Sequence, residues 1–147
     1  MTKIEEAVAY FKAGFSCSQA IMAAYGPTVG LDRDAAIKIA SGFGGGMGRM
    51  SETCGAVTGA FMVLGLKYGA ASTDRQAKET VYALVREFAA RFKECHGSLL
   101  CRDLLGCDLS TPEGLALSQE KKLSLTVCPP YVETAATILE EMLHDQQ

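Results

Sequence analysis

Apolar residues recur at helical spacing along most of the chain, and no useful length of it alternates with the period of two that a β-strand requires. In the first such segment, residues 2–13, an apolar stripe follows Thr2, which has capping-box spacing to Glu5. With 147 residues the chain has the length of one domain. We therefore predict an all-α fold for residues 1–147, a compact single-domain helical bundle of about eight helices around a central apolar helix.

The predicted central helix spans residues 51–68 and is apolar nearly all round, which is typical of a buried helix. Its glycines, Gly55, Gly59 and Gly65, cost helix stability and make sense where another backbone or a ligand comes close. The other segments with helical spacing behind a cap are residues 16–25, 32–40, 72–95, 98–105, a helix opened by Thr111 and Pro112, and one from residue 129 or 130 to 145.

Four of the six cysteines lie where the sequence predicts the first turn of a helix: Cys17, Cys54, Cys101 and Cys128. Unpaired backbone N–H groups and the helix dipole favour negative charge there, so we expect each thiol pKa to lie below the free value of about 8.5. The thiolate is both the nucleophile and the metal ligand. Because the buried helix that carries Cys54 must pack against its neighbours, we expect the four sulfurs to lie together in one cluster. The four cysteines are therefore our candidates for redox-active residues and for metal ligands.

Three interpretations of these cysteines remain open. The chain has no C-x-x-C pair, and a site of four distant cysteines suits an iron–sulfur cluster or a tetrahedral zinc ion. Two of the thiols could instead cycle between dithiol and disulfide without a metal. Cysteine is also a small, often buried hydrophobic residue, but four of them at helix starts favour a site. We expect Cys95, at a helix end, outside this site and Cys107 at its edge or on the surface.

The glycine-rich stretch of residues 42–49 precedes Cys54. No Gly-Lys-Ser/Thr follows and no strand precedes it, which argues against a nucleotide-binding loop. Gly44, Gly45 and Gly46 would let backbone N–H groups approach sulfurs or a bound anion, and Arg49 could add a charged contact. These four residues are therefore candidates for cofactor binding. The alternative is that the glycines only permit a tight turn into the buried helix.

Composition narrows the function classes. The net charge is −3 with scattered Lys and Arg, so nucleic-acid binding has no electrostatic basis. The most apolar segment, residues 56–66, is shorter than the ~18 residues of a membrane span, and the N-terminus does not have the pattern of a secretory signal. His96 and His144 are the only histidines, which argues against histidine-rich metal sites. We expect a cytoplasmic protein, in which cysteines serve metal binding, redox chemistry or burial rather than a disulfide framework.

The cysteine segments resemble a known family. Cys17, the run from Gly44 through Cys54 to Ala60, the run from Cys101 to Gly106, and Cys128-Pro129 occur in the order of the C_GCAxxG_C_C family, short helical proteins whose redox role was proposed from their cysteines. The chain reads Cys54-Gly55-Ala56 where the family label reads Gly-Cys-Ala. The resemblance covers about residues 14–143 and implies that Cys17, Cys54, Cys101 and Cys128 belong together, with Cys95 and Cys107 outside the pattern.

These observations favour a redox or electron-transfer protein whose four cysteines ligate an iron–sulfur cluster of the two-iron (2Fe-2S) type and which passes single electrons to a redox partner protein. The alternatives are a metal-free dithiol/disulfide redox protein and a structural zinc-binding helical interaction module. No general acid–base constellation is visible, so the sequence leaves open whether the protein is an enzyme. Its apolar content of 48% is compatible with a homodimer.

Overall fold

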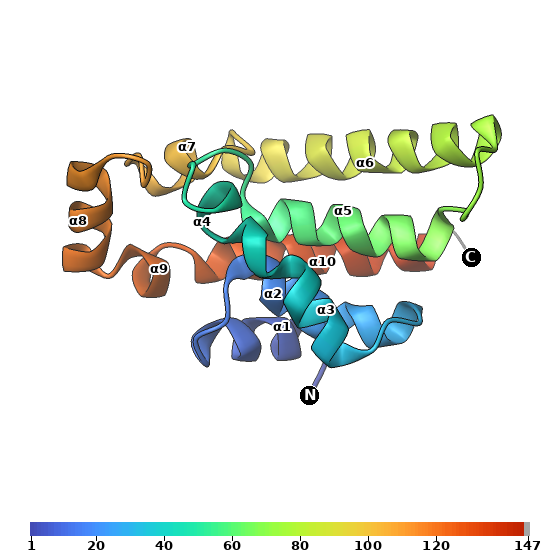
Figure 1. Cartoon of the computed structure of the whole chain (residues 1–147), viewed down its shortest axis with the longest axis horizontal. Helices are drawn as coiled ribbons and strands as arrows, with labels where there is room; N and C mark the ends of the chain where they lie inside the picture. Colours follow the sequence, from blue (N-terminus) through green and yellow to red (C-terminus); the bar gives the residue numbers. More distant parts are fainter. Residues whose placement is uncertain (146–147) are drawn as a thin grey trace.

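The computed structural model describes residues 1–145, and the regular secondary-structure elements in this part of the chain are all helices. Three long helices lie along the molecule in Figure 1: α5 (Gly55–Tyr68), α6 (Arg75–His96) and α10 (Pro129–Asp145). Helices α1 (Lys3–Lys12) and α2 (Cys17–Tyr25) pack against α10 and α5, and α3 (Arg33–Ala40) packs against α2. No strand forms within residues 1–145, so the predicted all-α class is confirmed.

The remaining elements are short: η1 (Gly26–Val29), η2 (Ser41–Phe43), α4 (Gly44–Met47), α7 (Cys101–Leu105), α8 (Pro112–Lys121) and α9 (Leu123–Thr126). Figure 1 shows that α4, α7, α8 and α9 gather at one end of the molecule, where α5 and α10 begin and α6 ends. We call this region the cysteine end. None of the helices within residues 1–145 is long and apolar enough to cross a membrane.

Helix α5 is the central helix, as predicted, and contacts α2, α6 and α10. Two of its glycines permit the close approach of α2. A Cβ on Gly59 would lie 3.1 Å from the Cβ of Ile21, and one on Gly55 would lie 3.0 Å from the backbone nitrogen of Ser18. Gly65 has no such neighbour within 4 Å. Close approach therefore explains the first two glycines but not the third.

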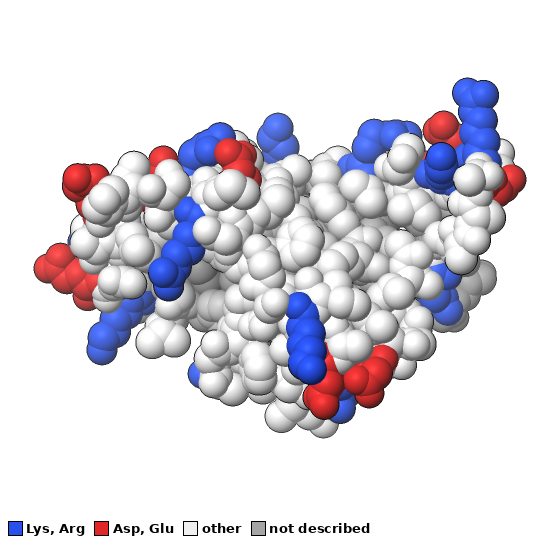
Figure 2. Space-filling model, in the orientation of Figure 1, with Lys and Arg blue, Asp and Glu red and all other residues white. Residues whose placement is uncertain are grey.

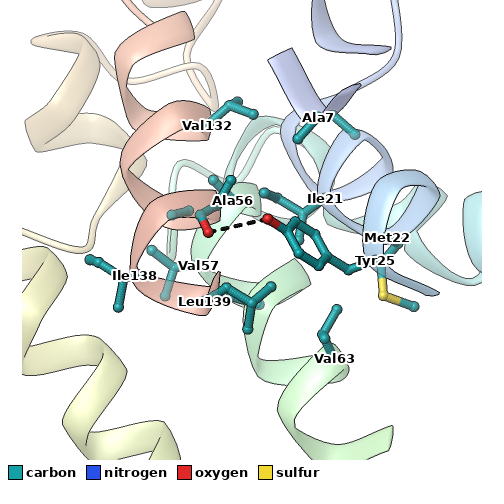
Figure 3. Packing of buried hydrophobic residues seen from close by; sticks show 14 of the residues in the cluster. Ala7, Ile21, Met22, Tyr25, Ala56, Val57, Val63, Val132, Ile138 and Leu139 are labelled. Atoms are coloured by element: carbon teal, nitrogen blue, oxygen red, sulfur yellow. Dashed lines mark hydrogen bonds between the residues drawn. The ribbon is translucent and has the colours of Figure 1, made fainter. Parts of the chain in front are cut away.

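The hydrophobic core lies between α2, α5 and α10 (Figure 3). Tyr25 is almost fully buried there, and its hydroxyl donates a hydrogen bond of 3.3 Å to the carbonyl of Ala136 on α10. On the far side of α5, the rings of Phe88 and Phe92 from α6 are fully buried and stacked. Burial of these side chains supplies the main stabilisation of the bundle, because burying one large apolar side chain is worth about 1.5–3 kcal/mol.

Side-chain caps start several of the predicted helices. The hydroxyls of Thr2 and Ser16 and the carboxylate of Asp32 each accept a hydrogen bond from the N–H three residues later, and Ser16 forms a full capping box with Gln19. The helix predicted over residues 72–95 begins later than expected, since α6 is capped by Asp74, whose carboxylate accepts a hydrogen bond from the N–H of Ala77.

Two other predicted helix starts were also wrong. Residues 51–54 and 98–100 are not helical, and Thr53 pairs with Leu100 in an isolated antiparallel bridge. The N–H of Cys54 donates to the carbonyl of Leu99 at 2.8 Å, and the N–H of Cys101 donates to the carbonyl of Glu52 at 2.6 Å. These bonds replace the first helical turn on both sides. They also hold the backbones of Cys54 and Cys101 next to each other.

Candidate functional site

The four predicted cysteines line one cavity of about 650 Å³ at the cysteine end. Each stands at a helix start, as the sequence indicated. Cys17 is the first residue of α2 and Cys101 the first of α7, while Cys54 and Cys128 directly precede α5 and α10. The tertiary fold therefore brings together four thiols that are far apart in the chain.

The four thiols differ in exposure. Cys54, Cys101 and Cys128 are buried, with 5%, 8% and 9% of their surface accessible, whereas Cys17 is half-buried. All six cysteines of the chain are free thiols. A small molecule inside the cavity can therefore reach sulfurs that the bulk solvent hardly touches.

Cys17 is the central member of the group, because the sulfurs of both Cys128 and Cys54 act on its thiol. Interaction with these two side chains, together with burial, raises the pKa of Cys17 well above its ordinary value. The same pair acts in the opposite direction on Cys54. The neighbouring Cys17 side chain lowers the pKa of Cys54, and the N–H groups of Ala56 and Val57 at the start of α5 lower it further against the opposing effect of burial.

Cys101 departs most clearly from expectation. Burial, with the nearby sulfurs of Cys54, Cys128 and Cys107, raises the pKa of the Cys101 thiol to about 12, although the Ser51 hydroxyl opposes this. The prediction that a helix start lowers the thiol pKa is thus right for Cys54 and wrong for Cys17 and Cys101. At these two thiols, burial and the neighbouring sulfurs raise the pKa by more than the helix start lowers it. For Cys101 the helix is also short, because α7 has only five residues.

The glycine-rich loop forms a tight left-handed turn into the site. Positive φ angles occur at Gly45, Gly46, Met47, Gly48, Arg49 and Ser51. The N–H groups of Arg49 and Ser51 donate to the carbonyls of Gly44 and Gly45, at 3.2 Å in both cases, so these donors are used within the loop rather than on a sulfur. A Cβ on Gly46 would lie 2.7 Å from the Cβ of Cys101. The left-handed backbone and the close contact with Cys101 therefore explain why residue 46 lacks a side chain.

Of the four loop residues predicted to bind a cofactor, Gly45, Gly46 and Arg49 line the cavity. Gly44 packs instead against Ser16, since a Cβ on it would lie 2.9 Å from the Ser16 Cβ. The Arg49 side chain lies over Gly45, where an added Cβ would be 2.8 Å from the Arg49 Cγ. The missing side chain at Gly45 thus leaves room for the stem of Arg49 at the cavity.

Sequence reasoning missed several residues of the site. Ser51 is fully buried; its hydroxyl accepts a 2.8 Å hydrogen bond from the N–H of Leu109, and it opposes the rise in the Cys101 pKa. Tyr131 lines the cavity and donates from its hydroxyl to the carbonyl of Leu104 at 2.7 Å. Residues of α8 and α9 complete the wall. No sequence signal marked these residues, because their roles arise from contacts between distant segments.

The two other cysteines lie where they were expected. Cys95 is exposed and lines a separate surface pocket beside α10, and Cys107 is half-buried and near Cys101, at the edge of the group. Four thiols on one cavity are the donor set of an iron–sulfur or zinc site. In their present arrangement, however, no three Cys, His, Asp or Glu side chains within the described residues are placed to hold one metal ion. The donors fit such a group by chemistry but are not preorganised around an ion.

Comparison with protein families gives a match that covers most of the chain. The family described as "Putative redox-active protein (C_GCAxxG_C_C)" matches residues 15–142 and so covers all four cavity cysteines. Comparison with curated proteins and with solved structures gives no match.

Proposed function

The chain belongs to the C_GCAxxG_C_C family, and on this basis we propose that it is a redox protein that works by thiol–disulfide exchange at Cys17 and Cys54. The proximity of these two residues carries the proposal: both line the cavity, and a Cβ on Gly55, the residue after Cys54, would lie 3.3 Å from the Cys17 Cβ. The neighbouring Cys17 side chain lowers the pKa of Cys54, while the pKa of Cys17 is raised. One thiol is thereby prepared as the attacking thiolate, and its neighbour is a protonated resolving thiol.

In the proposed reaction, the Cys54 thiolate attacks one sulfur of a disulfide substrate and releases the other as a thiolate, which takes up a proton. The Cys17 thiol then loses its proton and attacks the Cys54 sulfur of the mixed disulfide, which releases the second half of the substrate. Two electrons pass from the protein to the substrate, the Cys17 thiol supplies one of the two protons and solvent supplies the other, and a Cys17–Cys54 disulfide is left. A redox partner protein would return the protein to the dithiol form.

Counting thiols tests this proposal. We would oxidise metal-free protein in a Cys95→Ser background, where the exposed thiol outside the cavity is removed, and titrate the remaining thiols before and after. A loss of two thiols is expected, and Cys17→Ser or Cys54→Ser should abolish it. The matched control Cys107→Ser removes a thiol at the edge of the group and should leave the loss of two intact. A Cys17→Ser protein that still loses two thiols would contradict the proposal.

The second candidate is the iron–sulfur cluster, favoured by the observation that Cys17, Cys54, Cys101 and Cys128 line a single cavity. These four would be its ligands, and a bound cluster would supply single-electron transfer. Anaerobic purification with iron and sulfide analysis and visible absorption tests it; colourless, iron-free protein would count against it. Zinc at one equivalent per chain, with a large loss of stability on chelation, would favour the structural zinc module instead.

The proposal places the protein in the cytoplasm, where thiols stay reduced between turnovers. The scattered basic residues and the net charge of −3 support a protein or small-molecule partner rather than nucleic acid. Whether the working form is a homodimer is decided by light scattering at the concentration used for the thiol assay.

A further inference from the structure

The cavity is larger than the four thiols require. Its volume of about 650 Å³ falls in the range of about 300–1,000 Å³ that small-molecule sites occupy. Much of the wall is apolar and comes from three parts of the chain: Phe11 and Phe15 near α1, Leu105 and Leu109 near α7, and Leu115 and Leu125 on α8 and α9. Such a wall suits an organic molecule in contact with the sulfurs rather than water alone.

The charge of the wall is one-sided. It carries two cations, Arg49 and Lys122, and no aspartate or glutamate stands among the described lining residues, although the whole chain has a net charge of −3. Neither cation forms an ion pair within residues 1–145. Both residues are exposed, so they lie where the cavity meets solvent. The field at the entrance therefore favours anions over cations.

Both cations are held by unusual backbone. Arg49 has a φ of 65° in the left-handed loop, and Lys122 has a φ of 51° at the turn between α8 and α9. Figure 1 shows α8 and α9 projecting beyond the end of the long helices, and the face in Figure 2 carries side chains of both charges at that end. The two turns thus each bring a cation to the cavity, although their residues are far apart in sequence.

We infer that the cavity binds a low-molecular-weight organic disulfide that carries carboxylate groups, with the carboxylates at Arg49 and Lys122 and the disulfide at Cys54 and Cys17. This inference rests on the proposed thiol–disulfide exchange and names its substrate class. The balance is protein dithiol plus RSSR giving protein disulfide plus two RSH. The first bond formed is between Cys54 and one substrate sulfur, and the bond broken is the substrate S–S bond.

Three aliphatic disulfides of similar size but different charge test this inference: dithiodipropionate (dianion), dithiodiethanol (neutral) and cystamine (dication). We would measure the second-order rate at which each oxidises the reduced protein at low ionic strength. Dithiodipropionate should react about tenfold faster than cystamine, with dithiodiethanol between them, because electrostatic focusing raises the local substrate concentration. Added salt should reduce the difference.

Variants locate the effect. Arg49→Gln/Lys122→Gln should bring the three rates together, while Lys121→Gln, which removes the same charge next to Lys122 but outside the cavity wall, should preserve the order. Equal rates with the wild-type protein, a faster reaction with cystamine, or an equal effect of Lys121→Gln and Lys122→Gln would overturn the inference.

A binding measurement separates this inference from the proposed function. Thiodipropionate is a dianion of the same kind that has a thioether and cannot exchange with thiols. Calorimetry should show that the wild-type protein binds it and that Arg49→Gln/Lys122→Gln weakens binding about tenfold. If no disulfide reacts but thiodipropionate binds in this way, the redox proposal fails and the anion site stands. If thiodipropionate does not bind, the anion site is refuted whatever the thiols do.

Discussion

The helical bundle and the cysteine end of this protein are built in different ways. In the bundle, α2, α5, α6 and α10 bury regular apolar stripes with right-handed helical backbone. At the cysteine end, residues 45–51 are largely left-handed, and a single bridge between Thr53 and Leu100 joins two segments. The bundle is stabilised mainly by the amount of apolar surface buried, whereas the cysteine end depends on a few backbone contacts. Substitutions should therefore act on the two regions through different physical effects.

The largest effect is expected from Phe88→Ala in the bundle. Phe88 is fully buried and contacts Phe61 edge-on and Phe92 in a stack, at centroid distances of 5.9 and 6.3 Å. The cavity left behind should cost about 3–5 kcal/mol of unfolding free energy. Leu125→Ala at the cysteine end, where 58% of the side chain is exposed, should change it by only about 0.5 kcal/mol. Urea denaturation measures both, and equal losses would remove the contrast between the regions.

The next effect is expected from Gly46→Ala, where backbone rather than apolar burial is disturbed. An added Cβ would lie 2.7 Å from the Cys101 Cβ and from the Glu52 nitrogen, at a φ of 68°. We expect a loss of about 2–4 kcal/mol from overpacking and left-handed strain together. Gly48→Ala is the control, because φ is 59° but the nearest atom is 3.9 Å away; it should lose only about 1–2 kcal/mol. Similar losses in both variants would show that strain alone matters.

A smaller difference is expected between two thiols of the same cavity. Alkylation follows the thiolate fraction, so at pH 8 Cys54, with its lowered pKa, should react with iodoacetamide at least about tenfold faster than Cys101, with a pKa of about 12. As the pH rises toward 10, the Cys54 rate should level off while the Cys101 rate continues to rise.

Peptide mapping by mass spectrometry on metal-free, reduced protein measures this, with exposed Cys95 as the accessibility reference. Cys17→Ala should slow Cys54, because alanine removes the neighbouring thiol that lowers the Cys54 pKa. Equal rates for Cys54 and Cys101 at pH 8 would mean that the two thiols are not distinguished.

The smallest effect, and the only stabilising one, is expected from Gly65→Ala in α5. A Cβ at this helical position would meet nothing within 4 Å, so the substitution should add up to about 1 kcal/mol through helix propensity. Gly59→Ala in the same helix is the matched control, since its Cβ would press against Ile21, and it should destabilise. Thermal unfolding distinguishes the two variants. If Gly65→Ala lowered the unfolding temperature, the prediction that a side chain at this position has free space would be wrong.

Much of the fold could be predicted because helix signals act over a few residues. The caps at Thr2, Ser16 and Asp32 bond to an N–H three residues away, so they are legible in the chain itself. Residues 51–54 and 98–100 were wrongly predicted as helical for the same reason. Each segment has a composition compatible with a helix, but its backbone hydrogen bonds are made with the other segment. Rules that consider only neighbouring residues cannot predict a partner that is distant in the sequence.

The sequence by itself determined that the chain is helical and that Cys17, Cys54, Cys101 and Cys128 stand at helix starts, because periodicity and capping depend on neighbouring residues. Only the tertiary structure decided how these thiols differ. Burial and the side chains of distant cysteines raise the pKa values of Cys17 and Cys101, whereas the neighbouring Cys17 lowers the pKa of Cys54. It also decided that Arg49 and Lys122 share a cavity with them, since long-range packing determines which side chains meet across a cavity.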